Sequence, residues 1–155
     1  MRIGIIFRVS AKQSAWAEHA GETLRRAGFR SGGARAAIVE HLGRQDCCVS
    51  AQELFDGLRT GGRAVGIATV YRVLEQLADL RLVHRVDLGE GIARYEPALP
   101  GGEHHHHLVC GDCGRVEPFS DPALERALSR VAGARGYELD AHDVVLHGAC
   151  GDCRA

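Results

Sequence analysis

The chain has 155 residues, of which 45% are hydrophobic and 25% are charged, and its formal net charge at pH 7 is -1. The length suits one domain or two small ones, and the composition is ordinary for a folded soluble protein. No apolar run approaches the ~20 residues of a membrane-spanning helix, and residues 3–7 are too short for a signal-peptide core. We therefore expect a cytoplasmic protein with no membrane partner, in which paired cysteines favour metal or redox chemistry over disulfides.

Charge is divided unevenly along the chain. Residues 1–100 hold 14 Lys and Arg against 11 Asp and Glu, whereas residues 101–155 hold 5 against 9. All but one of the basic residues are arginine, which suits bidentate contacts to phosphate and guanine. The pattern suggests a nucleic-acid-binding front half and a metal-binding back half.

The front half contains four stretches with apolar residues at helical spacing. These predicted helices cover residues 13–27, 34–43, about 50–59 and 66–80. The third opens with a capping box formed by Ser50 and Glu53. In the fourth, Arg72 projects away from the apolar stripe formed by Ile67, Val70, Leu74, Leu77 and Ala78.

Two strands, at residues 82–87 and 92–96, follow the fourth helix, and a glycine-containing loop joins them as a hairpin. Three helices followed by a β-hairpin are typical of a winged helix. We therefore assign a DNA-binding domain to residues 1–96, with residues 1–12 as an N-terminal extension. Residues 97–103 are rich in Pro and Gly and are predicted to be a hinge.

The back half, residues 104–155, is predicted to be a small metal-binding domain. Strands are expected at residues 104–110, near 115–116 and at 143–147. A helix is expected to begin at the Asp121-Pro122 cap and to end near Gly133. The predicted fold class is α+β, with an N-terminal winged helix followed by this C-terminal α/β domain.

Two Cys-x-x-Cys pairs frame the back half, Cys110 with Cys113 and Cys150 with Cys153. Two thiolate pairs complete a tetrahedral zinc site, and the wide gap between them indicates that the site clamps a small domain. Just before the first pair, residues 104–107 are four consecutive histidines. On a strand, alternate histidines would face opposite sides, so one strand could serve two metal sites.

Together these residues resemble the ferric uptake regulator (Fur) superfamily, with its zinc uptake regulator branch as one option. The resemblance covers roughly residues 20–154. It rests on the sequences Gly-Ile-Ala-Thr-Val-Tyr-Arg at 66–72, His-His-His-His-Leu-Val-Cys-Gly-Asp-Cys-Gly at 104–114, Phe-Ser-Asp at 119–121 and Cys-Gly-Asp-Cys at 150–153. It implies a dimeric, metal-dependent repressor with a winged helix and a C-terminal dimerisation domain. Its partners would be a second copy of the chain and a pseudo-palindromic double-stranded DNA operator.

The resemblance also implies residues that contact DNA. Tyr71 and Arg72 match base-contacting positions of the recognition helix, and Thr69 lies beside Arg72. Arg30 matches a position that enters the minor groove. The alternative for Tyr71 is packing against the wing.

For metals, the resemblance implies three ligand sets. Cys110, Cys113, Cys150 and Cys153 match a structural Zn²⁺ site. His104, His106, Glu125 and His142 match one regulatory site. Cys48, Glu96, His105 and His107 match a second, hinge-side site.

The hinge-side set departs from the family pattern, because Cys48 stands where histidine is common. His84, on the first wing strand, is an alternative ligand. Another alternative is that Cys48 and Cys47 are simply small buried hydrophobic residues.

The leading hypothesis is a repressor and not an enzyme. Regulatory Zn²⁺ is favoured over Fe²⁺, because imidazole suits both ions and thiolate favours zinc. The alternative is an iron- or peroxide-sensing regulator. A rival hypothesis from another class is a zinc hydrolase that uses the histidines with Glu125, but the chain lacks a His-Glu-x-x-His motif.

Overall fold

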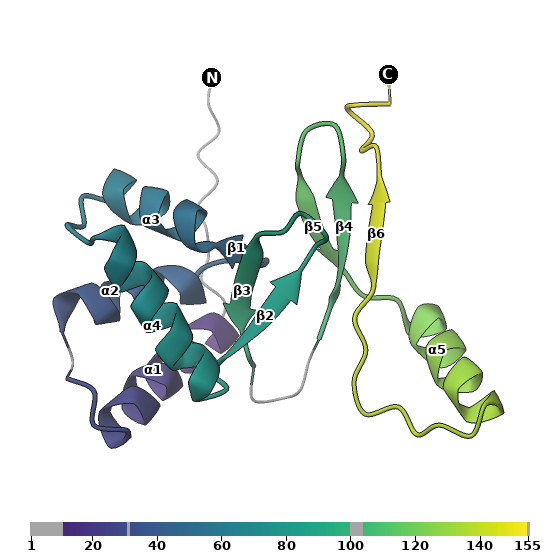
Figure 1. Ribbon diagram of the computed structural model, residues 1–155, viewed down its shortest axis with the longest axis horizontal. Helices are drawn as coiled ribbons and strands as arrows, with labels where there is room; N and C mark the ends of the chain where they lie inside the picture. Colours follow the sequence, from purple (N-terminus) through teal and green to yellow (C-terminus); the bar gives the residue numbers. More distant parts are fainter. Residues whose placement is uncertain (1–10, 31, 100–103, 155) are drawn as a thin grey trace. The chain divides into compact units, whose positions relative to one another are not determined.

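The computed structural model of the protein describes residues 11–30, 32–99 and 104–154. Its contacts divide the chain into two compact units, residues 1–102 and 103–155 (Figure 1). Most of the predicted N-terminal extension, and residues 100–103 of the predicted hinge, lie outside the described residues. Pro97, the first residue of the predicted hinge, is the last residue of a strand.

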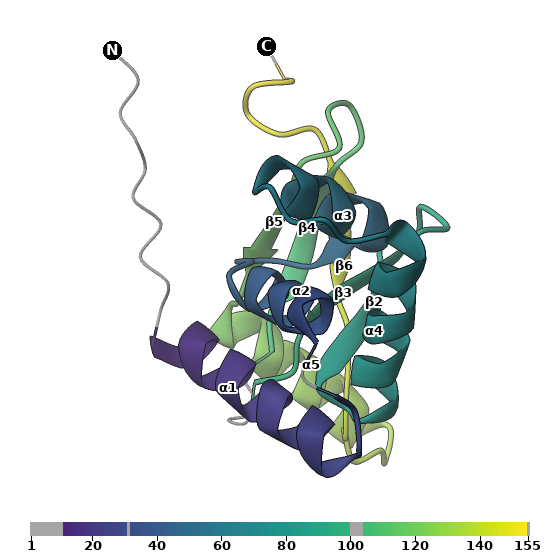
Figure 2. The ribbon, with the colours of Figure 1, turned by 90° about the vertical axis from the view of Figure 1, so that its left-hand side faces the viewer.

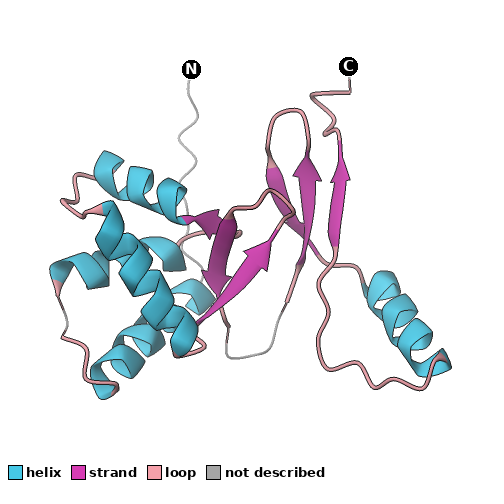
Figure 3. Cartoon of the chain, in the orientation of Figure 1, coloured by secondary structure: helices cyan, strands magenta, loops and turns pink. Residues whose placement is uncertain are grey.

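The first unit contains the four predicted helices and a small sheet (Figure 3). The helices are α1 (Ala11–Arg26), α2 (Gly33–Gly43), α3 (Ala51–Thr60) and α4 (Ile67–Asp79). The strands are β1 (Val49–Ser50), β2 (Val83–Asp87) and β3 (Ala93–Pro97). Within this unit the helices gather on one side of the sheet (Figures 1 and 2).

Local sequence explains where α3 begins. The Ser50 side chain accepts from the Glu53 amide at 3.2 Å, and the Glu53 carboxylate accepts from the Ser50 amide at 2.7 Å. The predicted capping box is therefore confirmed. Helix α4 buries one face, and this face includes Val73, which the predicted stripe lacks.

The core of the first unit lies between the helices and the sheet. The side chain of Trp16 is fully buried, and its indole Nε1 donates to the carbonyl of Leu82 at 2.9 Å. This bond joins α1 to the residue just before β2, 66 positions along the chain. Burying an indole requires a partner for its N–H, so the bond fixes how α1 lies against the wing.

The sheet of the first unit has the order β1-β3-β2 with antiparallel pairs. Strand β1 was not predicted, because two residues carry no period-2 pattern. Its pairing with β3 places the capping box of α3 directly beside the wing.

The second unit contains β4 (His106–Cys110), β5 (Val116–Phe119), α5 (Pro122–Ala134) and β6 (Val145–Gly148). The sheet order is β5-β4-β6, with β5 antiparallel and β6 parallel to β4. The Asp121 carboxylate caps α5 by accepting from two backbone amides, as predicted. None of the residues of α5 is buried.

The predicted α+β fold is confirmed, and element ends differ from the expected ones by a few residues, as helix and strand ends commonly do. The strand expected from residue 104 begins at His106. Within the described ranges, no helix is long and apolar enough to cross a membrane.

Candidate metal centres and DNA-contacting surface

Four cysteine sulfur atoms meet at one end of the second unit's sheet. Cys110 ends β4, Cys113 lies in the following turn, and Cys150 and Cys153 follow β6. The parallel register pairs Cys110 with Gly148, which brings the second cysteine pair beside the first. All four sulfur atoms lie within 4.8 Å of one another.

Hydrogen bonds at this cluster favour a thiolate. The amide of Cys150 donates to Cys110 Sγ at 3.3 Å. This bond, with one from the Cys113 amide, lowers the pKa of Cys110 from 9.0 to about 6. Hydrogen bonds with the neighbouring sulfur atoms of Cys150 and Cys113 raise the pKa of Cys153 to about 12. A cation that binds all four sulfur atoms must therefore displace protons.

The spacing of the sulfur atoms fits a tetrahedral ion. Two sulfur ligands at ~2.3 Å from zinc, at the tetrahedral angle, are about 3.8 Å apart. The sulfur atoms of Cys113 and Cys150 are 3.8 Å apart. The ion pair between Arg115 and Asp152, with 2.8 Å between Nη2 and Oδ2, links the two cysteine turns. A four-cysteine metal site is therefore present in the second unit.

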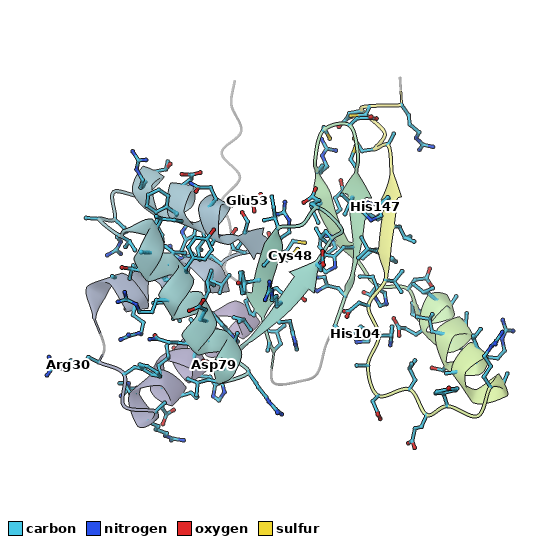
Figure 4. All side chains as sticks on the ribbon, in the orientation of Figure 1. Arg30, Cys48, Glu53, Asp79, His104 and His147 are labelled. Carbon is cyan, nitrogen blue, oxygen red and sulfur yellow. The ribbon has the colours of Figure 1, made fainter. Side chains whose placement is uncertain are left out.

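Three histidines converge on one carboxylate in the same unit, and Glu125 supplies that carboxylate from the first turn of α5. Its Oε1 is 2.7 Å from His106 Nε2 and 3.5 Å from His104 Nε2, and its Oε2 is 2.9 Å from His142 Nε2. The Nε2 atoms of His104 and His142 are 3.2 Å apart. His104 lies on the segment that leads into β4 (Figure 4).

The electrostatics of this cluster suit a divalent cation. The hydrogen bond with His106, aided by the charges of the other histidines, lowers the pKa of Glu125 below 4.5, so the carboxylate is ionised near neutral pH. The four candidate ligand atoms lie within 4.8 Å of one another. Imidazole and carboxylate ligands suit both zinc and iron, so the donor set does not choose between them.

The residues of the hinge-side ligand set are divided between the two units. In the first unit, β1 pairs with β3 so that Val49 faces Tyr95. One residue further along this antiparallel register, Cys48 faces Glu96, and their candidate ligand atoms lie within 4.8 Å. On the other side of β3, His84 of β2 pairs with Glu96.

Cys48, Glu96 and His84 thus lie in one row across the sheet, and residues in such a row share a face. Cys48 and His84, the two candidate ligands from the first unit, therefore lie on either side of Glu96. The hydrogen bond with Cys47, followed by burial, raises the pKa of Cys48. The thiol therefore keeps its proton until a cation displaces it.

In the second unit, the rings of His105 and His107 lie together, with centroids 4.9 Å apart. The rings of His104 and His106 form the other pair, at 5.2 Å. This is the alternation that the sequence predicts for the histidine run. The joint set of Cys48, Glu96, His105 and His107 stays a prediction.

The expected DNA-contacting residues lie on the surface of the first unit. Tyr71 is 51% exposed, so it is not one of the buried core residues of this unit. Arg72 is exposed beside it on α4, and Thr69 is half-buried one turn earlier. Arg30 is exposed in the loop before α2, and its side chain points away from the unit (Figure 4).

Sequence reasoning missed Arg35, in the first turns of α2. Its guanidinium donates to the carbonyl of Arg30 and, at 3.3 Å, to Gln76 Oε1 of α4. It also lies over the ring of Phe29, 5.3 Å from the centroid. Arg35 therefore joins the Arg30 loop to the helix that carries Arg72. The local sequence does not predict this contact with α4, because Arg35 and Gln76 are 41 positions apart.

A winged helix joined to a unit with clustered metal ligands defines a metal-responsive, DNA-binding regulator. The model of the ferric uptake regulator family matches residues 26–147. The chain belongs to this family.

Two curated relatives illustrate the similarity. The chain is 36% identical to the ferric uptake regulation protein of Bordetella parapertussis over 84% of this chain and 94% of that protein. It is 40% identical to the one from Escherichia coli K12, over 84% and 89%. The names of these relatives do not show whether this chain belongs to the zinc uptake regulator branch of the family.

Solved structures agree with these sequence matches. The structure of the Vibrio cholerae ferric uptake regulator, a protein with DNA-binding domains, matches with a TM-score of 0.74 at 37% identity. The match covers 84% of this chain and 98% of that one. The Helicobacter pylori regulator, described as having three functional metal-binding sites, has a TM-score of 0.80 at 25% identity, covering 96% and 97%. Members of the family are transcriptional regulators and not enzymes, so the hydrolase hypothesis is wrong.

Proposed function

We propose that this chain is a metal-activated transcriptional repressor that acts in the cytoplasm as a homodimer on double-stranded DNA. The observation that carries the proposal is the convergence of His104, His106 and His142 on the Glu125 carboxylate. A cation held there would replace contacts that now join three separate segments of the second unit: the histidine run, α5 and the segment before β6. The four-cysteine site, with Zn²⁺ as its proposed ion, would stabilise the same unit.

On the DNA side, we propose that α4 enters the major groove with Tyr71, Arg72 and Thr69, and that Arg30 reaches the minor groove. Exposure of the two arginines supports these roles. A guanidinium reads guanine through two parallel hydrogen bonds. Two-fold symmetry of the dimer would require a pseudo-palindromic operator.

The second unit offers apolar surface for a second copy of the chain. Its sheet exposes Leu108 and Leu146, and α5 and the segment after it expose Val131, Tyr137 and Leu139. Exposed apolar side chains concentrated in one small unit favour association over a solvated surface. This supports the second unit as the dimerisation domain.

We propose Fe²⁺ as the regulatory ion, and this choice differs from the zinc preference drawn from the sequence. The reason is that relatives at 36–40% identity are named ferric uptake regulation proteins. Three imidazoles and one carboxylate accommodate ferrous iron as well as zinc.

Zinc remains the second candidate, because a thiol at Cys48 lies beside Glu96 in the first unit, and thiolates favour zinc over iron. If Cys48 is a regulatory ligand, Cys48→Ala should raise the metal concentration at half-maximal DNA binding, and His84→Ala should not. The opposite result would transfer the role to His84 and remove this argument for zinc.

The test begins with DNA fragments selected from a random pool by the metal-loaded protein. Fluorescence anisotropy then follows binding during titration with Fe²⁺ without oxygen, or with Zn²⁺. Glu125→Gln keeps the size of the side chain and removes its charge. We expect it to raise the metal concentration at half-maximal binding by roughly tenfold or more, because even residues that only support ligands are worth that much.

The matched control is His147→Ala, which removes an exposed histidine of β6 outside the cluster. It should leave the midpoint unchanged. An unchanged midpoint for Glu125→Gln would refute the regulatory role of the cluster. DNA occupancy in cells depleted of iron or of zinc identifies the ion, since affinity alone favours zinc on chemical grounds. Loss of occupancy on zinc depletion only would overturn the choice of iron.

A further inference from the structure

A pocket lies between α1 and α2 of the first unit, away from the metal clusters and from the exposed face of α4. The two helices lie side by side (Figures 1 and 2). The pocket has a volume of about 280 Å³, near the lower end of the range for small-molecule sites in proteins. All the residues that line it lie between positions 14 and 40, so the pocket belongs to the first unit alone.

The walls of this pocket are largely apolar. Leu24 of α1 and Val39 of α2 line it with buried side chains. Ala17 and Phe29 line it with half-buried ones. An apolar molecule in the pocket would remove these side chains and its own surface from water, which favours binding.

Gly21 lines the pocket from the middle of α1. Glycine inside a helix is destabilising relative to alanine. A Cβ atom at this position would meet no neighbouring atom within 4 Å, so packing does not require a glycine here. A larger side chain at position 21 would take up space in the pocket. The glycine therefore weakens the helix and keeps the pocket open.

The charged residues that line the pocket are separated by sign. Arg25, Arg30 and Arg35 lie at the end next to the loop that joins α1 to α2. Glu18 and Glu40 lie further along their helices, and Glu18 is about 10 Å along the axis from Arg25. One end of the pocket is therefore positively charged, and this end complements an anionic group.

Two of these arginines have an arrangement that suits a carboxylate. Among the described residues, Arg25 forms a hydrogen bond only through Nε, which donates to the carbonyl of Gly21 at 3.4 Å. Its two terminal nitrogen atoms are available to an anion. The Arg35 guanidinium is held in place over the Phe29 ring and by its bond to Gln76. A fixed guanidinium loses little freedom when it binds a ligand.

We propose that this pocket binds a small apolar carboxylic acid. The hydrocarbon body lies between Leu24, Phe29 and Val39, and the carboxylate lies at Arg25 and Arg35. The volume suits a bicyclic aromatic acid or a medium-chain fatty acid. Within the proposed repressor function, the acid would act as an effector, because it neutralises positive charge beside the proposed DNA contact and should weaken DNA binding.

Isothermal titration calorimetry of the full-length protein, without DNA, tests the site directly. The probes are naphthoate, decanoate and the neutral analogue naphthalenemethanol. We expect at least one of the two acids to bind with a Kd on the order of 10–100 μM. Naphthalenemethanol should bind about tenfold more weakly than naphthoate, since it lacks the charge-assisted hydrogen bonds. If neither acid binds, the proposal is wrong.

Gly21→Leu tests the position of the ligand. Its side chain should fill the pocket and weaken binding of the acid by about tenfold or more, while leucine favours the helix. The matched control is Ala15→Leu, which adds the same side chain at an exposed position of α1 outside the pocket lining. It should leave the Kd unchanged. Equal Kd values for the two variants would overturn the assignment of the pocket.

Arg25→Gln tests the recognition of the carboxylate, and it still decides if Gly21→Leu fails to fold. It should weaken naphthoate binding by about threefold to tenfold and leave naphthalenemethanol binding unchanged. The control is Arg26→Gln, which removes the neighbouring arginine, an exposed partner of Glu22 outside the pocket lining. Equal losses in the two variants would show a general effect of charge and overturn the proposed carboxylate site.

A further variant without residues 1–10 tests another occupant, since this segment contains Ile5, Ile6 and Phe7. Binding of the acids only after its removal would assign the pocket to this segment and overturn the proposal. Fluorescence anisotropy with the selected DNA measures the effector role: naphthoate should weaken DNA binding of the wild type and not of Gly21→Leu. Unchanged DNA affinity would overturn that role. A protein that binds the acid but no DNA would refute the repressor function and leave the pocket standing.

Discussion

Replacing Arg35 by alanine tests how the two proposed DNA-contacting elements are held together. The Arg35 guanidinium donates to the carbonyl of Arg30 and to the side chain of Gln76, and it lies over the ring of Phe29. Alanine at position 35 removes all three contacts. It leaves Arg30 and the recognition helix chemically unchanged.

The expected cost follows from these contacts. Each hydrogen bond is worth about 0.5–1.5 kcal/mol net. The cation–π contact adds about 0.5–1 kcal/mol at an exposed site. Arg35 is half-buried, so water replaces part of what is lost, and alanine gains a few tenths in helix propensity. We expect a loss of about 1–2 kcal/mol in the free energy of unfolding of the first unit.

The assay is urea unfolding followed by tryptophan fluorescence. The chain has a single tryptophan, and Trp16 is fully buried in the core of the first unit, so the signal reports on this unit alone. With a urea slope of about 2 kcal/mol/M, the midpoint should fall by about 0.5–1 M. The control is Arg44→Ala, at the C-cap of the same helix, which removes an exposed ion pair with Glu40. It should cost at most about 0.5 kcal/mol.

Equal midpoints for Arg35→Ala and Arg44→Ala would refute the reasoning. DNA binding adds a second criterion. If Arg35 acts by positioning the Arg30 loop, then Arg30→Ala with Arg35→Ala should weaken binding by less than the sum of the single losses. Additive losses would show that the two residues act independently.

Three further predictions concern the metal site, the DNA surface and pH. Cys110→Ser should lower thermal stability and abolish dimers, because the ligands are scattered in the unfolded chain; a variant that keeps stability and bound zinc would contradict this. Arg72→Ala should weaken binding to the selected DNA by about 1–3 kcal/mol with normal metal content, and unchanged affinity in a footprinting titration would contradict it. Burial opposes ionisation of Glu53, but the Ser50 amide and Arg94 hold its pKa below 4.5. The stabilisation that ionised Glu53 gives to the folded state is complete above pH 4.5, and it is lost as the pH falls through the folded-state pKa of Glu53. The advantage of the wild type over Glu53→Gln in urea unfolding should therefore shrink on acidification, and an advantage that grows would refute this.

Interactions between residues a few positions apart were predictable. The Ser50–Glu53 capping box and the Asp121 cap of α5 both form as expected. Each depends on residues within three positions, so the backbone brings them together whenever a helix begins there. The apolar stripe of α4 and the pairing of alternate histidines follow from helix and strand periodicity in the same way.

The metal-ligand types were also visible in the sequence, because cysteine pairs and a histidine run have few other uses. Tertiary contacts bring these metal ligands together. Only the parallel pairing of β4 with β6 places Cys150 beside Cys113, 37 positions earlier. Only the position of α5 brings Glu125 to three histidine rings.

Two features had no sequence signal: strand β1 and the link from Arg35 to Gln76. A two-residue strand exists because β3 offers it hydrogen bonds, and Arg35 finds Gln76 because α2 packs on α4. Residue types and local periodicity determine which elements form and which ligands are available. Long-range pairing decides which of them meet, since contacts between distant segments form only once the chain has closed the loops between them.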